Sequence, residues 1–167
     1  MDMEEALQAY IACADELTSA LSGLCEADLN RGPVDGWNIR QIVHHIADGD
    51  ELWKTCILLA MGNPDAEFHL AWYWDISQDD WAESWSYGQR KIGTSLARLR
   101  ANRLHVVELL RQKPESWTYS ARMHIPTQTE ECRVSIADVV KSQTDHVQQH
   151  LADIRALSRL HSGEGTA

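Results

Sequence analysis

The last part of the chain repeats its apolar residues with the period of an α-helix, and no other feature constrains the fold more. Within residues 135–161 (SIADVVKSQTDHVQQHLADIRALSRLH), one stripe contains Ile136, Val139, Val140, Val147, Leu151, Ile154 and Leu157. Ser135 and Asp138 supply a capping pattern at the start of this helix. A long helix with one apolar stripe has to bury that stripe against other elements of the protein.

Three further segments have the same helical period. We predict helices over residues 2–22, 38–61 and 77–112, which begin at the capping residues Asp2, Asn38 and Ser77. Residues 64–76 are expected to form a loop, and residues 113–134 a longer link that is extended or packed across the bundle. Four amphipathic helices without a convincing strand pattern predict an all-α four-helix bundle, in which at least one longer connection is a crossover.

The length of the chain suits a single domain with a sizeable core. Its 167 residues fall within the usual range for one domain, which we predict over residues 1–161. The tail 162–167, SGEGTA, is rich in small and polar residues and is expected to be disordered.

The charge balance argues against two classes of partner. The chain has 15 basic and 25 acidic residues, a net charge of −10, which disfavours both nucleic acid and an anionic membrane surface. No apolar run approaches the roughly 20 residues needed to span a bilayer. The four cysteines are widely spaced, and no secretory signal precedes the first helix, so we expect a cytoplasmic protein. With nucleic acid and membranes disfavoured, we expect a small-molecule substrate.

Two histidines interrupt the apolar stripe of the last helix. His146 and His150 are four residues apart and therefore project from one face, on the side expected to face the core. Burying unsatisfied polar groups costs about 1–3 kcal/mol each, so both rings need partners. A shared metal ion would supply one, and ordinary buried hydrogen bonds are the alternative.

A catalytic zinc-type site usually has three protein ligands and one open position, so a third ligand is required. The chain has eight histidines: His44, His45, His69, His105, His124, His146, His150 and His161. His69 and His124 lie in segments predicted as loops or links, and His105 points away from the stripe of its helix. His161 lies roughly 16 Å along the helix axis from His150 and cannot share the ion.

Position on the helical wheel favours His45 over His44. His45 lies roughly 110° from the centre of the apolar stripe of 38–61, at the core boundary, and His44 roughly 150° away, nearer to solvent. We therefore predict His45 as the third ligand and His44 as a solvated or supporting residue. Cys56 lies on the flank of His45 but about 16 Å along the helix, and is expected to be a small buried hydrophobe.

Two sequence motifs then resemble a known family. GWNIRQIVHHIAD (36–48) has a tryptophan, Trp37, eight residues before His45, which is followed by an apolar residue, a small residue and Asp48. About 100 residues later, VSIADVVKSQTDHVQQHLADI carries the H-x-x-x-H pair. The two motifs at this separation resemble the DinB-like superfamily of metal-binding four-helix bundles, and the resemblance covers roughly residues 5–160.

This resemblance implies a metal site and a range of functions. It implies that His45, His146 and His150 bind a divalent ion such as nickel or zinc, often in a homodimer. Relatives include transferases and isomerases that depend on bacillithiol or mycothiol, and residues 124–126 (HIP) are similar to the bacillithiol-transferase branch. Many relatives have another histidine beside the last ligand, where this chain has Gln149.

We therefore expect a metal-dependent enzyme, with transfer or isomerisation that involves a low-molecular-weight thiol first and metal-dependent hydrolysis second. The ion would activate a bound thiol or water as the nucleophile. A non-catalytic metal-containing binding or stress-response protein is the alternative from another class. The H-E-x-x-H pattern is absent, which argues against a protease with a built-in glutamate base.

Two residues near the predicted ligands are unusual for their positions on the helices. Gly49 lies one turn after His45, where a missing side chain leaves room for a ligand or permits close helix packing. Gln143 lies one turn before His146, on the face where an apolar residue is expected. It is a weak candidate for a catalytic or ligand-binding role, and a buried structural hydrogen bond is the alternative.

Carboxylates and tryptophans also surround the predicted site. Asp48, Asp145 and Asp153 each lie near a predicted ligand in the sequence. Each could orient an imidazole, act as a base or be solvated. Asp48 is the other weak candidate for a catalytic residue. A group of tryptophans follows the second predicted helix and could line a pocket, form a dimer face or pack in the core: Trp72, Trp74, Trp81 and Trp85.

Overall fold

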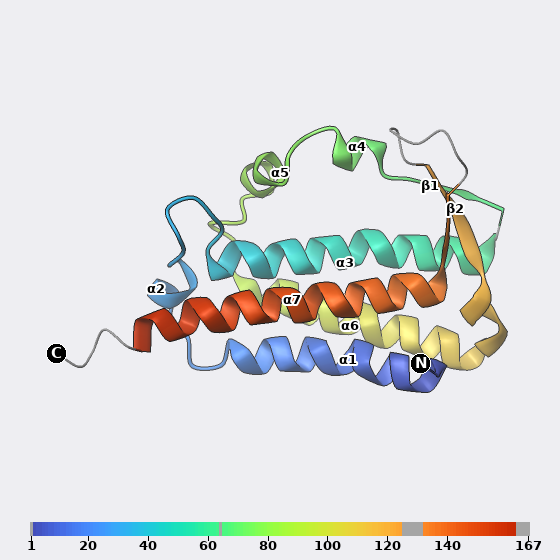
Figure 1. Cartoon of the computed structure of the whole chain (residues 1–167), viewed down its shortest axis with the longest axis horizontal. Coiled ribbons are helices and arrows are strands. Elements are labelled where there is room, and N and C mark those ends of the chain that lie inside the picture. Colours follow the sequence, from blue (N-terminus) through green and yellow to red (C-terminus); the bar gives the residue numbers. More distant parts are fainter. Residues whose placement is uncertain (1, 64, 125–131, 163–167) are drawn as a thin grey trace.

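Four long helices form the bundle in the computed structural model, which describes residues 2–63, 65–124 and 132–162 (Figure 1). They are α1 (Met3–Ala20), α3 (Ile39–Gly62), α6 (Ile92–Gln112) and α7 (Ile136–Ser162). Helices α6 and α7 each pack against both α1 and α3, so α1 and α3 occupy opposite corners. The predicted all-α four-helix bundle is therefore confirmed, and the connections from α1 to α3 and from α6 to α7 are crossovers.

The capping residues start the helices where the sequence indicated. The Asn38 side chain accepts a hydrogen bond from the Gln41 backbone N–H (2.9 Å), and the Gln41 side chain accepts one from the Asn38 N–H (3.0 Å). Ser135 accepts a hydrogen bond from the Asp138 backbone N–H (3.1 Å) at the start of α7. These local bonds satisfy N–H groups that the first helical turn leaves unpaired.

The third predicted helix is interrupted, and the expectation of one continuous helix over 77–112 is wrong. Helix α5 (Gln78–Ser84) ends before Ser86, which has a left-handed backbone (φ 54°), and α6 begins at Ile92. The intervening segment is held to α3, because Arg40 donates a hydrogen bond to the Arg90 carbonyl (2.8 Å) and a ring nitrogen of His44 lies 3.0 Å from the same oxygen. These contacts across the bundle favour a turn over continuation of the helix.

Short strands occur in the segment expected to be a loop and in the link expected to be extended or packed across the bundle. Strand β1 (Glu67–His69) and helix α4 (Ala71–Trp74) lie within the predicted loop 64–76. Strand β2 (Ser120–His124) lies within the predicted link 113–134, and β3 (Cys132–Ser135) extends one residue past its end. Strand β2 pairs in parallel with β1 and antiparallel with β3, closing one end of the bundle. Strands of three to five residues are too short to reveal an alternating pattern, which explains why the sequence missed them.

Two further short helices lie in the connections. Helix α2 (Glu26–Leu29) lies between α1 and α3, and a 3₁₀ helix, η1 (Pro114–Thr118), follows α6. Helix α7 includes Ser162, and the rest of the predicted tail, residues 163–167, lies outside the described residues. Among the described helices, none combines the length and the apolar character needed to cross a membrane.

A polar layer crosses the bundle between two apolar clusters. One cluster includes Tyr10, Ile57 and Val106, and the other includes Leu17 and Leu99. Between them, the layer consists of four buried polar residues near the predicted metal ligands: Asp50, Asn102, Arg103 and Gln143. The candidate site therefore lies at mid-height in the bundle, where helices α3 and α7 face each other.

Candidate metal centre

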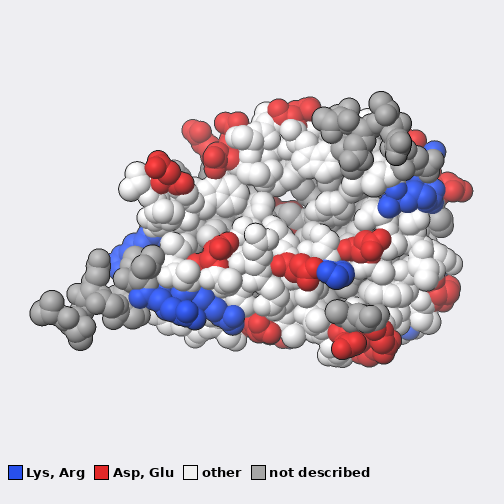
Figure 2. Space-filling view, in the orientation of Figure 1, with Lys and Arg blue, Asp and Glu red and all other residues white. Residues whose placement is uncertain are grey.

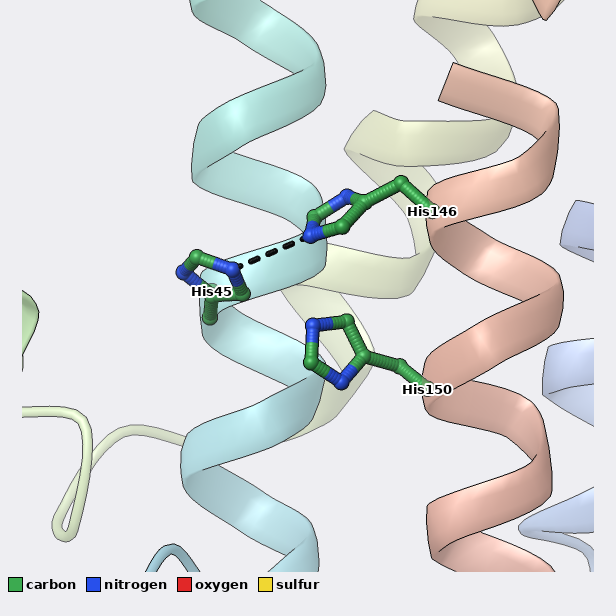
Figure 3. A group of neighbouring side chains, drawn as sticks. All are labelled: His45, His146 and His150. Atoms are coloured by element: carbon green, nitrogen blue, oxygen red, sulfur yellow. Dashed lines mark hydrogen bonds between the residues drawn. The ribbon is translucent and has the colours of Figure 1, made fainter. Parts of the chain in front are cut away.

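Helices α3 and α7 bring His45, His146 and His150 together (Figure 3). One ring nitrogen from each of the three residues lies within 4.8 Å of the other two, and all three side chains are partly buried. The closest approach is 3.1 Å, between Nε2 of His45 and Nε2 of His146. The structure therefore assembles the three predicted ligands, two of them from one helix face and the third from the neighbouring helix.

The environment keeps two of these rings neutral. Burial, together with the nearby rings of His146 and His150, lowers the pKa of His45 to about 3. Burial, His150 and Arg103 lower the pKa of His146 to about 4. Both imidazoles are therefore uncharged near neutral pH, with a lone pair free to bind a cation.

The donor set fits a divalent metal ion. Neutral imidazole nitrogens are common ligands for zinc and nickel, and three protein ligands leave room for an exogenous one. No fourth histidine, cysteine or carboxylate joins the group within residues 2–63, 65–124 and 132–162. In the same part of the chain, the buried Nδ1 of His45 has no hydrogen-bond partner, so side-chain bonds alone leave this ring unsatisfied.

Asp153 orients one of the three rings. Nδ1 of His150 lies 3.1 Å from a carboxylate oxygen of Asp153, one helical turn further along α7. With the proton on Nδ1, this N–H donates a hydrogen bond to the carboxylate, and Nε2 presents its lone pair to the other two histidines. Among the three aspartates singled out from the sequence, Asp153 is the one that contacts a predicted ligand.

We expect Asp153→Asn to lower the affinity for a divalent ion by about 10-fold, because partners of metal-bound histidines contribute about 10–100-fold and this carboxylate is half exposed. Competition against a chromophoric chelator measures the affinity. Asp145→Asn is the matched control, because Asp145 pairs with Lys141 at the surface of the same helix. Equal affinities for the two variants would contradict the orienting role.

Trp37 forms a wall of the site. Its ring centroid lies 4.8 Å from that of His45, in an edge-to-face arrangement. Its indole N–H donates a hydrogen bond to Asp79 at the start of α5 (2.6 Å), which fixes the ring. The family motif pointed to Trp37, whereas no signal in the sequence connected Asp79 with it.

His44 is buried, so its predicted position near solvent is wrong. Its side chain is 0% exposed, with Nδ1 2.9 Å from the Ser95 hydroxyl and Nε2 3.0 Å from the Arg90 carbonyl. The wheel failed because it assumed one buried face, whereas α3 packs against both α6 and α7. His44 faces the α6 side and supports the Arg90 turn, outside the histidine cluster.

The other two aspartates are engaged elsewhere. The Asp48 carboxylate accepts hydrogen bonds from Arg90 (2.8 Å) and from Arg98. Burial alone would raise the pKa of Asp48, but the two guanidinium groups hold it below its usual value. Asp48 is therefore ionised and paired toward the α6 side of α3, and Asp145 pairs with Lys141.

Two cavities border the histidine cluster. The first, about 250 Å³, is lined by His45 and His146 together with Gly49, Trp53 and Gln143. The second, about 350 Å³, lies beside His150 and is lined by apolar side chains and one carboxylate: Pro33, Trp37, Ile42, Leu157 and Asp153. The face shown in Figure 2 has dispersed acidic residues around a hollow lined mainly by uncharged atoms.

The four tryptophans have different environments. Trp74 lines the first cavity, next to Tyr73. Trp81 and Trp85 stack on Tyr73, at centroid distances of 5.5 and 6.2 Å, and therefore pack the α4–α5 segment. Trp72 remains 49% exposed. Of the roles expected for the four tryptophans, lining a pocket therefore applies to Trp74, and packing applies to Trp81 and Trp85.

Buried Arg103 was missed in the sequence although a signal was present. It lies four residues after Leu99 and three before Val106, within the apolar stripe of α6. Its guanidinium donates hydrogen bonds to Asp50 on α3, to the Tyr10 carbonyl on α1 and to the Gln143 carbonyl on α7. Arg103 therefore connects four helices, and its contact on α7, Gln143, lies one turn from His146.

Comparison with known proteins supports this architecture. The sequence model of the DinB superfamily matches residues 2–154. YfiT from Bacillus subtilis, described as a probable metal-dependent hydrolase with an unusual four-helix bundle topology, has a TM-score of 0.80 and 20% identity, over 97% of this chain and 90% of that chain. A mycothiol-dependent maleylpyruvate isomerase has a TM-score of 0.64 and 14% identity, over 92% of this chain and 61% of that chain. No curated protein sequence matches.

Proposed function

Because the chain belongs to the DinB superfamily, we propose that His45, His146 and His150 bind one divalent metal ion and that the protein is a metal-dependent thiol S-transferase. The observation that carries this proposal is the convergence of three imidazoles from α3 and α7 beside two cavities. Three ligands with adjoining space are typical of a catalytic site, whereas a structural zinc site has four protein ligands.

The chemistry of a bound ion would complement what the chain supplies. A divalent cation lowers the pKa of a thiol or water bound to it, which makes a nucleophile available at neutral pH. The chain holds His45 and His146 neutral by burial, and Asp153 orients His150. Trp37 packs edge-to-face on His45 and fixes one side of that ring.

Two cavities favour transfer over hydrolysis. Hydrolysis needs room for one organic substrate, whereas transfer to a thiol needs room for two reactants at the same ion. One cavity adjoins His45 and His146, and the other adjoins His150. Metal-dependent hydrolysis is the second candidate, favoured by the likeness to YfiT, whose description is that of a probable metal-dependent hydrolase.

We expect protein purified without a histidine tag to bind one zinc or nickel ion per chain, and His150→Ala to bind it at least about 100-fold more weakly, because one of three ligands is lost. Titration calorimetry and elemental analysis measure both quantities. His69→Ala is the control, because His69 is exposed on β1, outside the cluster. Equal binding by wild type and His150→Ala would contradict the metal site.

Turnover is tested with a panel of thiols and a small electrophile. We expect metal-dependent consumption of a thiol by wild type and none above background by His150→Ala. If the metal-loaded protein consumes no thiol but hydrolyses an activated ester, the transferase proposal fails and the hydrolase remains. If it does neither, the non-catalytic binding function is favoured.

A further inference from the structure

The cavity beside His45 and His146 is lined by a glycine at a position where helix packing would allow a larger side chain. Gly49 lies in the interior of α3, where glycine is less favourable than alanine. The residue is buried, yet a Cβ atom added to it would meet no heavy atom of the described residues within 4 Å, apart from its chain neighbours and the nearby backbone of its own helix. Close helix packing is therefore not the reason for this glycine. The space beside it is part of the cavity.

A buried polar side chain borders the same cavity without a partner. Gln143 is only 4% exposed, and within the described part of the chain its Oε1 accepts no hydrogen bond. Its backbone carbonyl accepts one from Arg103 (3.1 Å), which holds this turn of α7 in place. The terminal torsion of a glutamine side chain is broad, so the amide can turn Oε1 toward the cavity. A hydrogen-bond donor in the cavity would satisfy this oxygen, whereas an acceptor would leave it unpaired.

The rest of the lining is apolar or uncharged. Leu52, Trp53 and Trp74 supply apolar surface, and the Tyr73 hydroxyl donates its hydrogen bond to Gln78 (2.7 Å). No lysine, arginine, aspartate or glutamate of the described residues lines this cavity. Away from the histidines, an ionised group would lose its hydration without gaining a counter-charge, so an uncharged group is favoured in that part of the cavity.

We propose that this cavity binds an uncharged, largely apolar group that donates a hydrogen bond to Oε1 of Gln143. That this group is part of the substrate, held beside the metal-binding histidines, rests on the proposed function. The binding itself does not. The space left by Gly49 holds the apolar body of the group, and Gln143 selects for its N–H or O–H donor. The second cavity, beside His150, remains free for the other reactant.

The test uses indole and benzothiophene, two rings of similar shape of which only indole has an N–H donor. Binding to the full-length protein, with and without added zinc, is followed by titration calorimetry and by shifts of the tryptophan indole N–H signals in NMR spectra. We expect wild type to bind indole about five-fold more tightly than benzothiophene, the contribution of an ordinary hydrogen bond. Gln143→Met keeps the side-chain volume and should bind both rings equally.

Filling the cavity should abolish the binding of both rings. We expect Gly49→Leu to weaken indole binding at least about 10-fold, because its side chain occupies the space of the ligand. Gly93→Leu is the matched control, since Gly93 is also helical and also has open space at its Cβ, but lies away from the cavity. Gly49→Ala is the milder variant: it should fold, melt at a higher temperature and bind indole a few-fold more weakly.

The outcomes separate this inference from the proposed function. If one zinc ion binds but neither ring does, or if indole binds Gly49→Leu as it binds wild type, the inference is overturned and the metal site stands. Equal binding of the two rings by wild type would overturn the role of Gln143. If the rings bind as expected and no metal does, the cavity is supported and the proposed function fails.

Discussion

Asp50→Ala is expected to destabilise the protein by about 3–5 kcal/mol, the cost of leaving one member of a buried ion pair without its partner. The Asp50 side chain is 0% and the Arg103 side chain 1% exposed, and the guanidinium donates to the carboxylate at 2.7 and 2.9 Å. Arg103 also lies over the Tyr10 ring, with its Cζ 4.1 Å from the centroid. Removing the carboxylate leaves a cation at the centre of the bundle without a counter-charge.

Urea denaturation of the metal-free protein, followed by circular dichroism, measures this loss. Asp15→Ala is the control, because Asp15 pairs with Arg100 at the surface, where both side chains are about half exposed, and should cost at most about 1 kcal/mol. In a double variant, Asp50→Leu with Arg103→Met, apolar side chains replace the pair and most of the stability should return. If Asp50→Ala costs no more than Asp15→Ala, the buried pair does not stabilise the fold as we infer.

The metal-free protein is expected to lose stability as the pH falls from about 6.5 toward 4. Burial lowers the pKa of His45 to about 3 and of His146 to about 4, whereas both titrate near 6.5 in the unfolded chain. Below pH 6.5 the unfolded chain therefore binds protons that the native state does not, and acid favours unfolding. At pH 5 this amounts to about 2 kcal/mol for each histidine. Above pH 7 both states are neutral at these residues, and the effect vanishes.

Urea midpoints at pH 7.5, 6.5, 5.5 and 4.5 test this expectation. The double variant His45→Gln with His146→Gln cannot titrate at these positions, so its midpoint should fall much less over the same range. Burial also lowers the pKa of His44, which remains in the variant and accounts for a smaller residual slope. Parallel pH profiles for wild type and variant would show that the cluster does not cause the acid sensitivity.

The sequence predicted the candidate site better than it predicted the chain around it. Spacing placed His146 and His150 on one helix face. The distance along the helix axis excluded His161 and Cys56 as further metal ligands. The wheel selected His45, which the structure places beside the pair. It misplaced His44 because α3 is covered on two sides, and a wheel does not reveal how many neighbours a helix has.

The rest of the fold depends on partners distant in sequence. The break near Ser86 is accompanied by bonds from Arg40 and His44 to the Arg90 carbonyl, nearly 50 residues away. The small sheet joins Glu67–His69 to Ser120–His124, which lie more than 50 residues apart. Neither segment has a strand pattern of its own that could have revealed the pairing.

The sequence by itself determined the helical class, the starts of α3 and α7 and the shared face of His146 and His150, because capping bonds and helical period act within a turn or two. Only the tertiary structure decided that Gly49 borders open space, that Oε1 of Gln143 lacks a donor within the described residues and that Arg103 connects four helices. Each of these depends on which helix faces which across the bundle, and that arrangement follows from packing the whole chain rather than from any local stretch of it.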